Sequence, residues 1–212
     1  TAAQAGLKTH AVLTDMNEVL GSTAGNALEI AESIRFLRND VREARLNEVT
    51  LSLCAEMLIN AGLETDRAAA RTRCDAAVTS GHAAEKFAAM VAALGGPADL
   101  LDAPAKHLAS APVIRPVYAS GVIAAVDTRA MGNAIIELGG GRRRVGEALD
   151  LSVGFSDIAP VGTALDSATP LAIIHAATDG AAEQAEANLR AAVRIGDEPP
   201  RERPVIREIL TA

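Results

Sequence analysis

The sequence predicts an α/β protein that takes on α+β character toward its C-terminus. Between residues 26 and 94, apolar side chains recur at the three- and four-residue spacing of amphipathic helices. Beyond a Pro-, Gly- and Ala-rich stretch, short β-like runs alternate with two more helical patterns. Only 2% of the 212 residues are aromatic, although 49% are hydrophobic. The core must therefore consist mainly of Ala, Val, Leu and Ile.

The first elements follow from glycines and apolar spacing. A glycine cap at Gly6 and a short buried strand over residues 10–13 form half of an αβ unit. The loop NEVLGSTAG comes next, and Ser22 or Thr23 is expected to cap a helix that ends near Leu37. Three more helices are predicted, over residues 41–61, 66–79 and 82–94.

The segment GGPADLLDAPAKHLASAP separates this helical pattern from a strand-rich one. It predicts a linker over residues 97–111 between domains at 1–96 and 112–212. In the second domain, helices are expected over residues 128–139 and 181–196. Strands are expected over residues 113–119, 121–127, 148–154, 171–177 and 204–210.

Charge and cysteine content exclude several classes of function. Lys and Arg number 20 against 27 Asp and Glu, a net charge of -7, which argues against a nucleic-acid or anionic-membrane surface. No apolar run approaches the roughly 18–20 residues of a membrane helix. Cys54 and Cys74 fit no metal-ligand spacing, so reduced thiols and a cytoplasmic location are expected, with a disulfide between the two as the alternative. Because the chain opens at Thr1, we also expect it to start inside a longer protein.

No motif for a self-contained hydrolase, nucleotide-binding loop or metalloenzyme occurs. The histidines are scattered, and structural roles are expected for all of them: His10, His82, His107 and His175.

The segment from Gly139 to Arg144, GGGRRR, has two interpretations. Its glycines allow successive backbone N–H groups to form an anion-binding nest beside three cations. Alternatively, the glycines stop a helix in the left-handed conformation and the arginines complement its C-terminal dipole.

Acidic residues gather around the first loop and helix. Carboxylates and turn carbonyls there are suited to a hard cation, whereas solvated helix charges are the simpler interpretation. The residues concerned are Asp15, Glu18, Glu29 and Glu32. Asp127 and Asp150 each lie at the edge of an element, where aspartate most commonly acts as a cap.

Four segments together resemble one enzyme family. LTDMNEVLGSTAGNALEI spans residues 13–30 and VTLSLCAEMLI spans residues 49–59; VYASGVIAAVDTRAMGNAIIELGGGRRR and LSVGFSDIA lie further on. They resemble the pyrimidine nucleoside phosphorylase family, and their residues are most similar to those of its bacterial thymidine phosphorylase branch. The resemblance covers residues 9–207 and corresponds to the C-terminal half of these enzymes. It implies the end of a mixed-sheet α/β domain with a helical cluster, followed by a small barrel-sandwich-like α+β domain.

The resemblance implies a glycosyltransferase that carries out phosphorolysis, in which phosphate attacks the anomeric carbon of a pyrimidine deoxynucleoside as the base leaves. In the family, the phosphate loop and the cations that hold the base precede the block that opens this chain, and no KHSTGG-like loop occurs here. We therefore expect no catalytic or substrate-binding residue within these 212 residues, and no cofactor for the chemistry. The family also implies a cytoplasmic homodimer formed through a helical domain outside this chain.

One family site transfers to this sequence. Some members bind a monovalent cation, potassium, through two backbone carbonyls and a glutamate that match Leu20, Thr23 and Glu32, with the remaining ligands in the half that precedes this chain. Val19 and Thr23 depart from the family's usual proline and alanine, which a carbonyl ligand tolerates because no side chain donates. The alternative is that Glu32 is an ordinary surface glutamate.

Two other functions remain open from sequence: a noncatalytic scaffold or oligomerisation module, and a related phosphorylase of broader base preference. A covalent biotinyl or lipoyl carrier is excluded, since no lysine follows Lys106.

Overall fold

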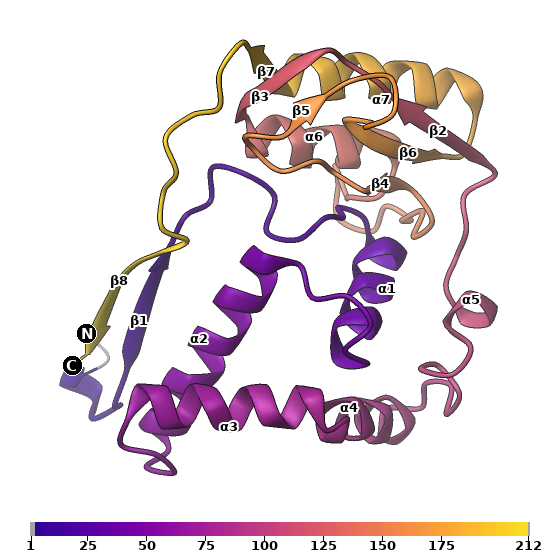
Figure 1. The fold of residues 1–212 in the computed structure, drawn as a ribbon. Helices are drawn as coiled ribbons and strands as arrows, with labels where there is room; N and C mark the ends of the chain where they lie inside the picture. The colour runs from indigo at the N-terminus through magenta and orange to yellow at the C-terminus, as the bar shows by residue number, and fades with distance from the viewer. Residues whose placement is uncertain (1–2, 212) are drawn as a thin grey trace. The chain divides into compact units, whose positions relative to one another are not determined.

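The computed structural model describes residues 3–211 and divides the chain into two compact units (Figure 1). Within the described residues, unit 1 comprises residues 3–15, 35–98 and 203–211, and unit 2 comprises residues 16–34 and 99–202. Neither unit is continuous in sequence. The division falls between residues 98 and 99, inside the predicted linker, but residues 16–34 group with the later segment and residues 203–211 with the earlier one.

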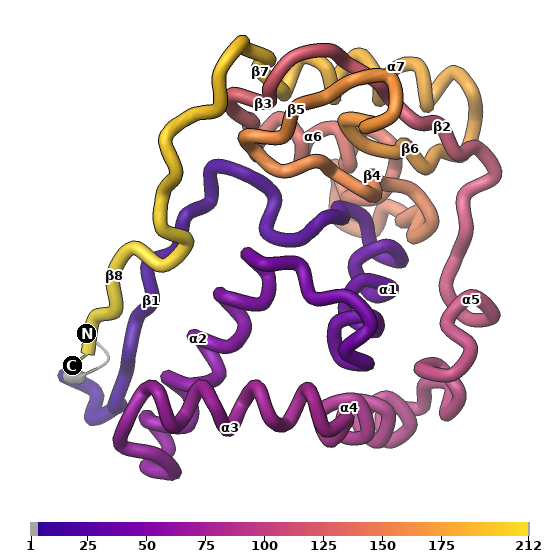
Figure 2. Tube along the Cα trace, viewed as in Figure 1, coloured from indigo at the N-terminus to yellow at the C-terminus, as the bar shows by residue number. Residues whose placement is uncertain are grey.

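Unit 1 combines helices with a two-stranded sheet. It contains the 3-10 turn η1 (Ala3–Ala5), α2 (Ala44–Asn60), α3 (Arg67–Thr79), α4 (His82–Ala93) and the strands β1 (His10–Thr14) and β8 (Ile206–Thr211). β1 and β8 pair antiparallel, with His10 opposite Thr211. Figure 2 traces how these two strands, from opposite ends of the chain, lie side by side.

Acidic side chains cap the starts of α2 and α3. Glu43 accepts a hydrogen bond from the Leu46 N–H at the start of α2, and Asp66 accepts one from the Ala69 N–H at the start of α3. Gly81, with φ of 84°, turns the chain between α3 and α4. All four predicted helices between residues 26 and 94 are confirmed, with ends that differ by a few residues.

Unit 2 contains two three-stranded antiparallel sheets and most of the buried core. The sheets have the strand orders β2-β6-β4 and β5-β3-β7. Their strands are β2 (Val113–Val117), β3 (Gly121–Val126), β4 (Gly154–Ser156), β5 (Ala164–Leu165), β6 (Ala172–Ala176) and β7 (Val193–Gly196). The helices are the short α5 (Pro104–His107), α6 (Thr128–Leu138), α7 (Asp179–Ala192) and α1 (Asn26–Leu37), of which residues 35–37 group with unit 1.

Apolar residues from both sheets, α6 and α7 form one core in unit 2. α6 packs against α7, and α7 packs against β6 and β2. Phe155, Ile123, Ile174 and Leu189 are fully buried there, and small alanines let the helices approach closely. The α+β character predicted for this region is confirmed, and every strand pairing among the described residues is antiparallel.

Several boundaries predicted from the sequence were wrong. The helix predicted over residues 181–196 ends at Ala192, and β7 follows it. The strand predicted over residues 148–154 is displaced, because residues 154–156 pair with β6 to form β4. α5 lies within the predicted linker, and β5 was not predicted.

Candidate functional site

The loop before α1 closes around the carboxylate of Glu32. Glu32 is 9% exposed, so it is not the surface glutamate that the simpler interpretation predicts. Its Oε1 accepts hydrogen bonds from the backbone N–H of Ser22 at 2.7 Å and from the Ser22 hydroxyl at 2.6 Å. Its Oε2 accepts one from the Thr23 hydroxyl at 2.6 Å. Three donors thus satisfy much of the hydrogen-bonding capacity of this buried carboxylate.

A glycine permits this close approach. A Cβ atom on Gly21 would lie 2.5 Å from Oε2 of Glu32, closer than real Cβ contacts allow. The loop also departs from the predicted capping: Ser22 and Thr23 donate to Glu32, while the Gly25 N–H at the start of α1 donates to Glu29. The serine hydroxyl is the contact that the sequence analysis missed.

The structure brings two of the three predicted cation ligands into contact. Thr23 contacts Glu32 through its hydroxyl, whereas the predicted ligand is the Thr23 carbonyl, and the partly buried Leu20 immediately precedes Gly21. Within residues 3–211, no three His, Cys, Asp or Glu side chains come together in a metal-binding arrangement.

The other acidic residues of the predicted cluster have separate partners. Asp15 is 5% exposed and pairs with the Arg207 guanidinium. Glu18 accepts a hydrogen bond from the Val161 N–H at 2.9 Å, and Glu29 accepts one from the Gly25 N–H. The four carboxylates thus do not share one site.

The loop of residues 20–25, which surrounds the Glu32 carboxylate and is called the Glu32 loop below, is hydrogen-bonded to β4 within unit 2. Ala24 and Phe155 exchange two backbone hydrogen bonds, of 2.9 and 2.8 Å, and the Ala27 N–H donates to the Leu151 carbonyl at 3.0 Å. The segments GSTAGNALE and LSVGFSD, which both contributed to the family resemblance, therefore meet in the fold.

The glycines of the Gly139–Arg144 segment close a helix. Gly139 ends α6 with φ of 100°, as the helix-stop interpretation predicts. A Cβ on Gly140 would lie 2.8 Å from Ile135, and one on Gly141 would lie 2.6 Å from Ile136, so both are needed for packing. Asp127 caps α6 as expected, by accepting from the Ala130 N–H.

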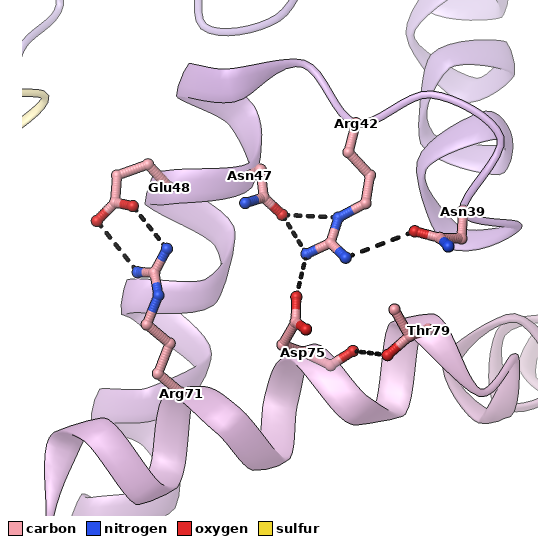
Figure 3. Close-up of polar contacts among 7 residues, drawn as sticks. All are labelled: Asn39, Arg42, Asn47, Glu48, Arg71, Asp75 and Thr79. Carbon is pink, nitrogen blue, oxygen red and sulfur yellow. Dashed lines mark hydrogen bonds and ion pairs between the residues drawn. The ribbon is translucent and has the colours of Figure 1, made fainter.

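In unit 1, Arg42 and Arg71 form hydrogen bonds and ion pairs with neighbouring residues (Figure 3). Arg42 donates to Asn39, Asn47 and Asp75 and lies over the Phe36 ring, 5.5 Å from its centre. Arg71 on α3 donates to both carboxylate oxygens of Glu48 on α2. These contacts link α2 to α3 and to the segment that precedes α2.

A hollow of about 260 Å³ lies beside Arg71 in unit 1, between α2, α3 and β8. The charged side chains that line it already form ion pairs: Glu56 pairs with Arg67, and Arg71 pairs with Glu48. The hollow therefore offers little polar recognition for a ligand.

Each histidine has its own partner, as expected for structural histidines. His10 contacts Glu56, His82 contacts Ser80, His107 contacts Asp99 and His175 contacts Ser156. Burial lowers the pKa of His175. Cys54 and Cys74 are both free thiols, and burial raises the pKa of each.

The chain is similar to known proteins of one enzyme family. Residues 122–196 match the model of the pyrimidine nucleoside phosphorylase C-terminal domain. Thymidine phosphorylases of Burkholderia orbicola (strain MC0-3) and Burkholderia cenocepacia (strain HI2424) are each 52% identical to this chain over 195 residues. That alignment covers 91% of this chain but 44% of each relative. No helix among the described residues is long and apolar enough to span a membrane. The resemblance seen in the sequence is confirmed, because the chain is similar to proteins named thymidine phosphorylase over less than half of their length.

Proposed function

We propose that this chain forms part of a thymidine phosphorylase. The observation that supports the proposal is the 52% identity to proteins of that name over 91% of the chain. In the reaction, the bond between the anomeric carbon and the pyrimidine nitrogen breaks, and a bond from that carbon to a phosphate oxygen forms. Thymidine and phosphate yield thymine and 2-deoxyribose 1-phosphate, and the base takes up a proton.

In this proposal the chain is a structural part of the enzyme, and the groups that bind the two substrates lie outside it. Phosphorolysis requires phosphate and nucleoside to be aligned, with cations beside the leaving base. The Arg42 and Arg71 side chains face partners within unit 1, and no phosphate loop of the family's kind occurs in the sequence. The groups that hold both substrates then belong to the part of the relatives outside the matched 44%. A cytoplasmic homodimer is part of the same proposal.

Steady-state phosphorolysis tests this division of labour. A protein in which the upstream region of a Burkholderia relative precedes this chain should release thymine from thymidine in the presence of phosphate. The 212-residue chain by itself should show no turnover above the uncatalysed rate, because alignment of the substrates accounts for about 7–11 kcal/mol of the barrier. Turnover by the purified chain would overturn the placement of the active site. An inactive joined protein that is correctly folded would overturn the function.

The Glu32 loop is proposed to bind potassium through the carbonyls of Leu20 and Thr23 and the carboxylate of Glu32. Support comes from the burial of Glu32 and its contacts with Ser22 and Thr23, which fix a negative charge beside the loop backbone. A carboxylate oxygen has lone pairs for a hard cation in addition to its hydrogen bonds.

We expect potassium to raise the melting temperature of the joined protein, and Glu32→Gln to abolish most of this response. A ligand that binds only the folded state stabilises it by about 2.7 kcal/mol at a hundred times its dissociation constant. The melting temperatures should be compared in potassium and in a bulky organic cation at equal ionic strength. Glu29→Gln, an exposed carboxylate on the same helix, is the matched control. Equal potassium responses in the parent and Glu32→Gln would exclude the site.

A further inference from the structure

The exposed loop after α6 contains two backbone N–H groups that converge on one anion. The N–H groups of Arg143 and Arg144 both donate to Oε2 of Glu147, at 2.7 and 3.2 Å. Two successive amides that converge on a single oxygen are the arrangement by which backbone nests bind anions. The nest predicted from the three glycines therefore exists, but it is formed two residues later by arginine amides, and the chain's own carboxylate fills it.

The side chains of this loop leave its positive charge largely uncompensated. Arg142 Nε donates to the Glu147 carbonyl at 3.1 Å, and Arg143 Nη2 donates to the Glu137 carbonyl at 3.4 Å. Both acceptors are neutral. The Arg144 guanidinium has no hydrogen bond or ion pair with any residue of the range 3–211. The loop from residue 142 to residue 147 thus carries three arginine side chains and one carboxylate, Glu147.

The loop is open to solvent while its start is fixed. Residues 142–148 are all exposed, and Val145 at the tip is fully so. The loop leaves α6 at a defined position, because the Gly140 N–H donates to Ile135 and the Asp150 N–H donates to Gly139. The Asn26 side chain also donates to the Gly140 carbonyl, at 2.9 Å. A small ligand can therefore reach the nest from solvent without rearrangement of the core of unit 2.

We propose that residues 142–147 form a binding site for the phosphate group of a small ligand, in which Glu147 is an internal competitor. A phosphate carries more charge than a carboxylate and has three acceptor oxygens, so it takes over both amide donors and also engages the arginine side chains. Glu147 is tethered beside the nest and competes at a high effective concentration. The site goes beyond the proposed function, and it is tested on the 212-residue chain without any catalytic assay.

Backbone NMR of the isotopically labelled chain gives a direct readout. Titration with inorganic phosphate should shift the amide resonances of Arg143 and Arg144 saturably, whereas sodium chloride at matched ionic strength should not. A parallel titration with a sugar monophosphate distinguishes the two sources of the anion: tighter binding than inorganic phosphate assigns a phosphate ester as the ligand. Inorganic phosphate as the tighter ligand assigns the free anion.

Three variants test the mechanism. Glu147→Gln removes the competing charge and should tighten phosphate binding about two- to fivefold, the range expected for one exposed charge. Arg144→Gln should weaken binding to a similar extent. Arg194→Gln removes an exposed charge on β7, away from the loop in sequence, and should leave the affinity unchanged. Unchanged affinity in both loop variants, or shifts that chloride reproduces, would overturn the proposal.

Discussion

Replacing Gly154 with alanine is expected to destabilise unit 2 by about 3 kcal/mol or more, since a strained backbone and an overpacked site each cost about 1–3 kcal/mol. Gly154 has φ of 152°, a conformation that residues with a side chain rarely adopt. A Cβ atom there would lie 2.2 Å from the Ala24 carbonyl oxygen and 2.9 Å from Gly25 Cα. The two backbones cannot separate without breaking the paired hydrogen bonds between Ala24 and Phe155.

Thermal unfolding measures this effect directly. The melting temperature of Gly154→Ala should fall by roughly 6–12 °C, given about 2–4 °C per kcal/mol for a chain of this size. Gly132→Ala is the control, since Gly132 lies within α6 and its Cβ would have no neighbour within 4 Å. That variant should be stabilised by about 0.5–1 kcal/mol, because glycine is a poor helix former. If Gly154→Ala melts no lower than the parent, the close approach of β4 to the Glu32 loop is not rigid.

The sequence predicted elements well where a local signal decides them. The helices from Asn26 to Ala93 follow from apolar spacing, and Asp127 caps α6 as its position before a helix predicted. The strands β2, β3 and β6 follow from β-branched runs between turn residues. These patterns report on contacts within a few residues, which is why the local structure could be predicted from them.

Predictions were wrong where pairing with a strand distant in the sequence determines the secondary structure. β7 was predicted as the end of a helix, but Val193 and Ile195 alternate with polar or small neighbours and pair with β3. β4 is displaced because Gly154 to Ser156 match the register of β6. The pairing of β1 with β8 joins residues almost a full chain length apart, and no local pattern encodes it.

In the candidate site, too, local features could be predicted from the sequence, whereas features that depend on the path of the chain could not. Glu32 was found from the family resemblance, which also named Leu20 and Thr23, but its burial and its contact with Ser22 depend on the path of the loop around Gly21. In the Gly139–Arg144 segment, the glycines and the helix end were predictable. The acceptor for the arginine amides, Glu147, was missed because an exposed loop glutamate carries no distinctive sequence signal.

Glu56→Gln is expected to reduce the free energy of unfolding by about 2 kcal/mol, within the range for hydrogen bonds to charged groups. The Glu56 side chain is 6% exposed and links three elements of unit 1. It contacts Nδ1 of His10 on β1 at 2.5 Å and pairs with Arg67 at the start of α3, while it lies itself on α2. The amide of Gln keeps the size but loses the charge, so the buried His10 side chain loses an ionised partner.

The pH dependence identifies the charge as the cause. The Arg67 guanidinium lowers the pKa of the Glu56 carboxyl, with a further contribution from His10, and burial opposes both. A carboxyl whose folded pKa is depressed stabilises the fold above its unfolded pKa, about 4.3 for Glu. That contribution is lost as the pH falls through the folded pKa. The parent should therefore exceed Glu56→Gln in stability at neutral pH, and the difference should shrink below about pH 4.

Urea unfolding of both proteins at several pH values between neutrality and about pH 3 tests the prediction, because the difference between them cancels the titration of groups that do not interact with Glu56. Glu64→Gln serves as the control. Glu64 pairs with Arg73 at 3.0 Å, but the Arg73 side chain is more than half exposed, so the change should cost less than about 1 kcal/mol. A Glu56→Gln penalty that matches this control, or one that does not vary with pH, would contradict a buried ionised link between β1, α2 and α3. In that case the packing of α2 on α3, and not the charge, holds these elements together.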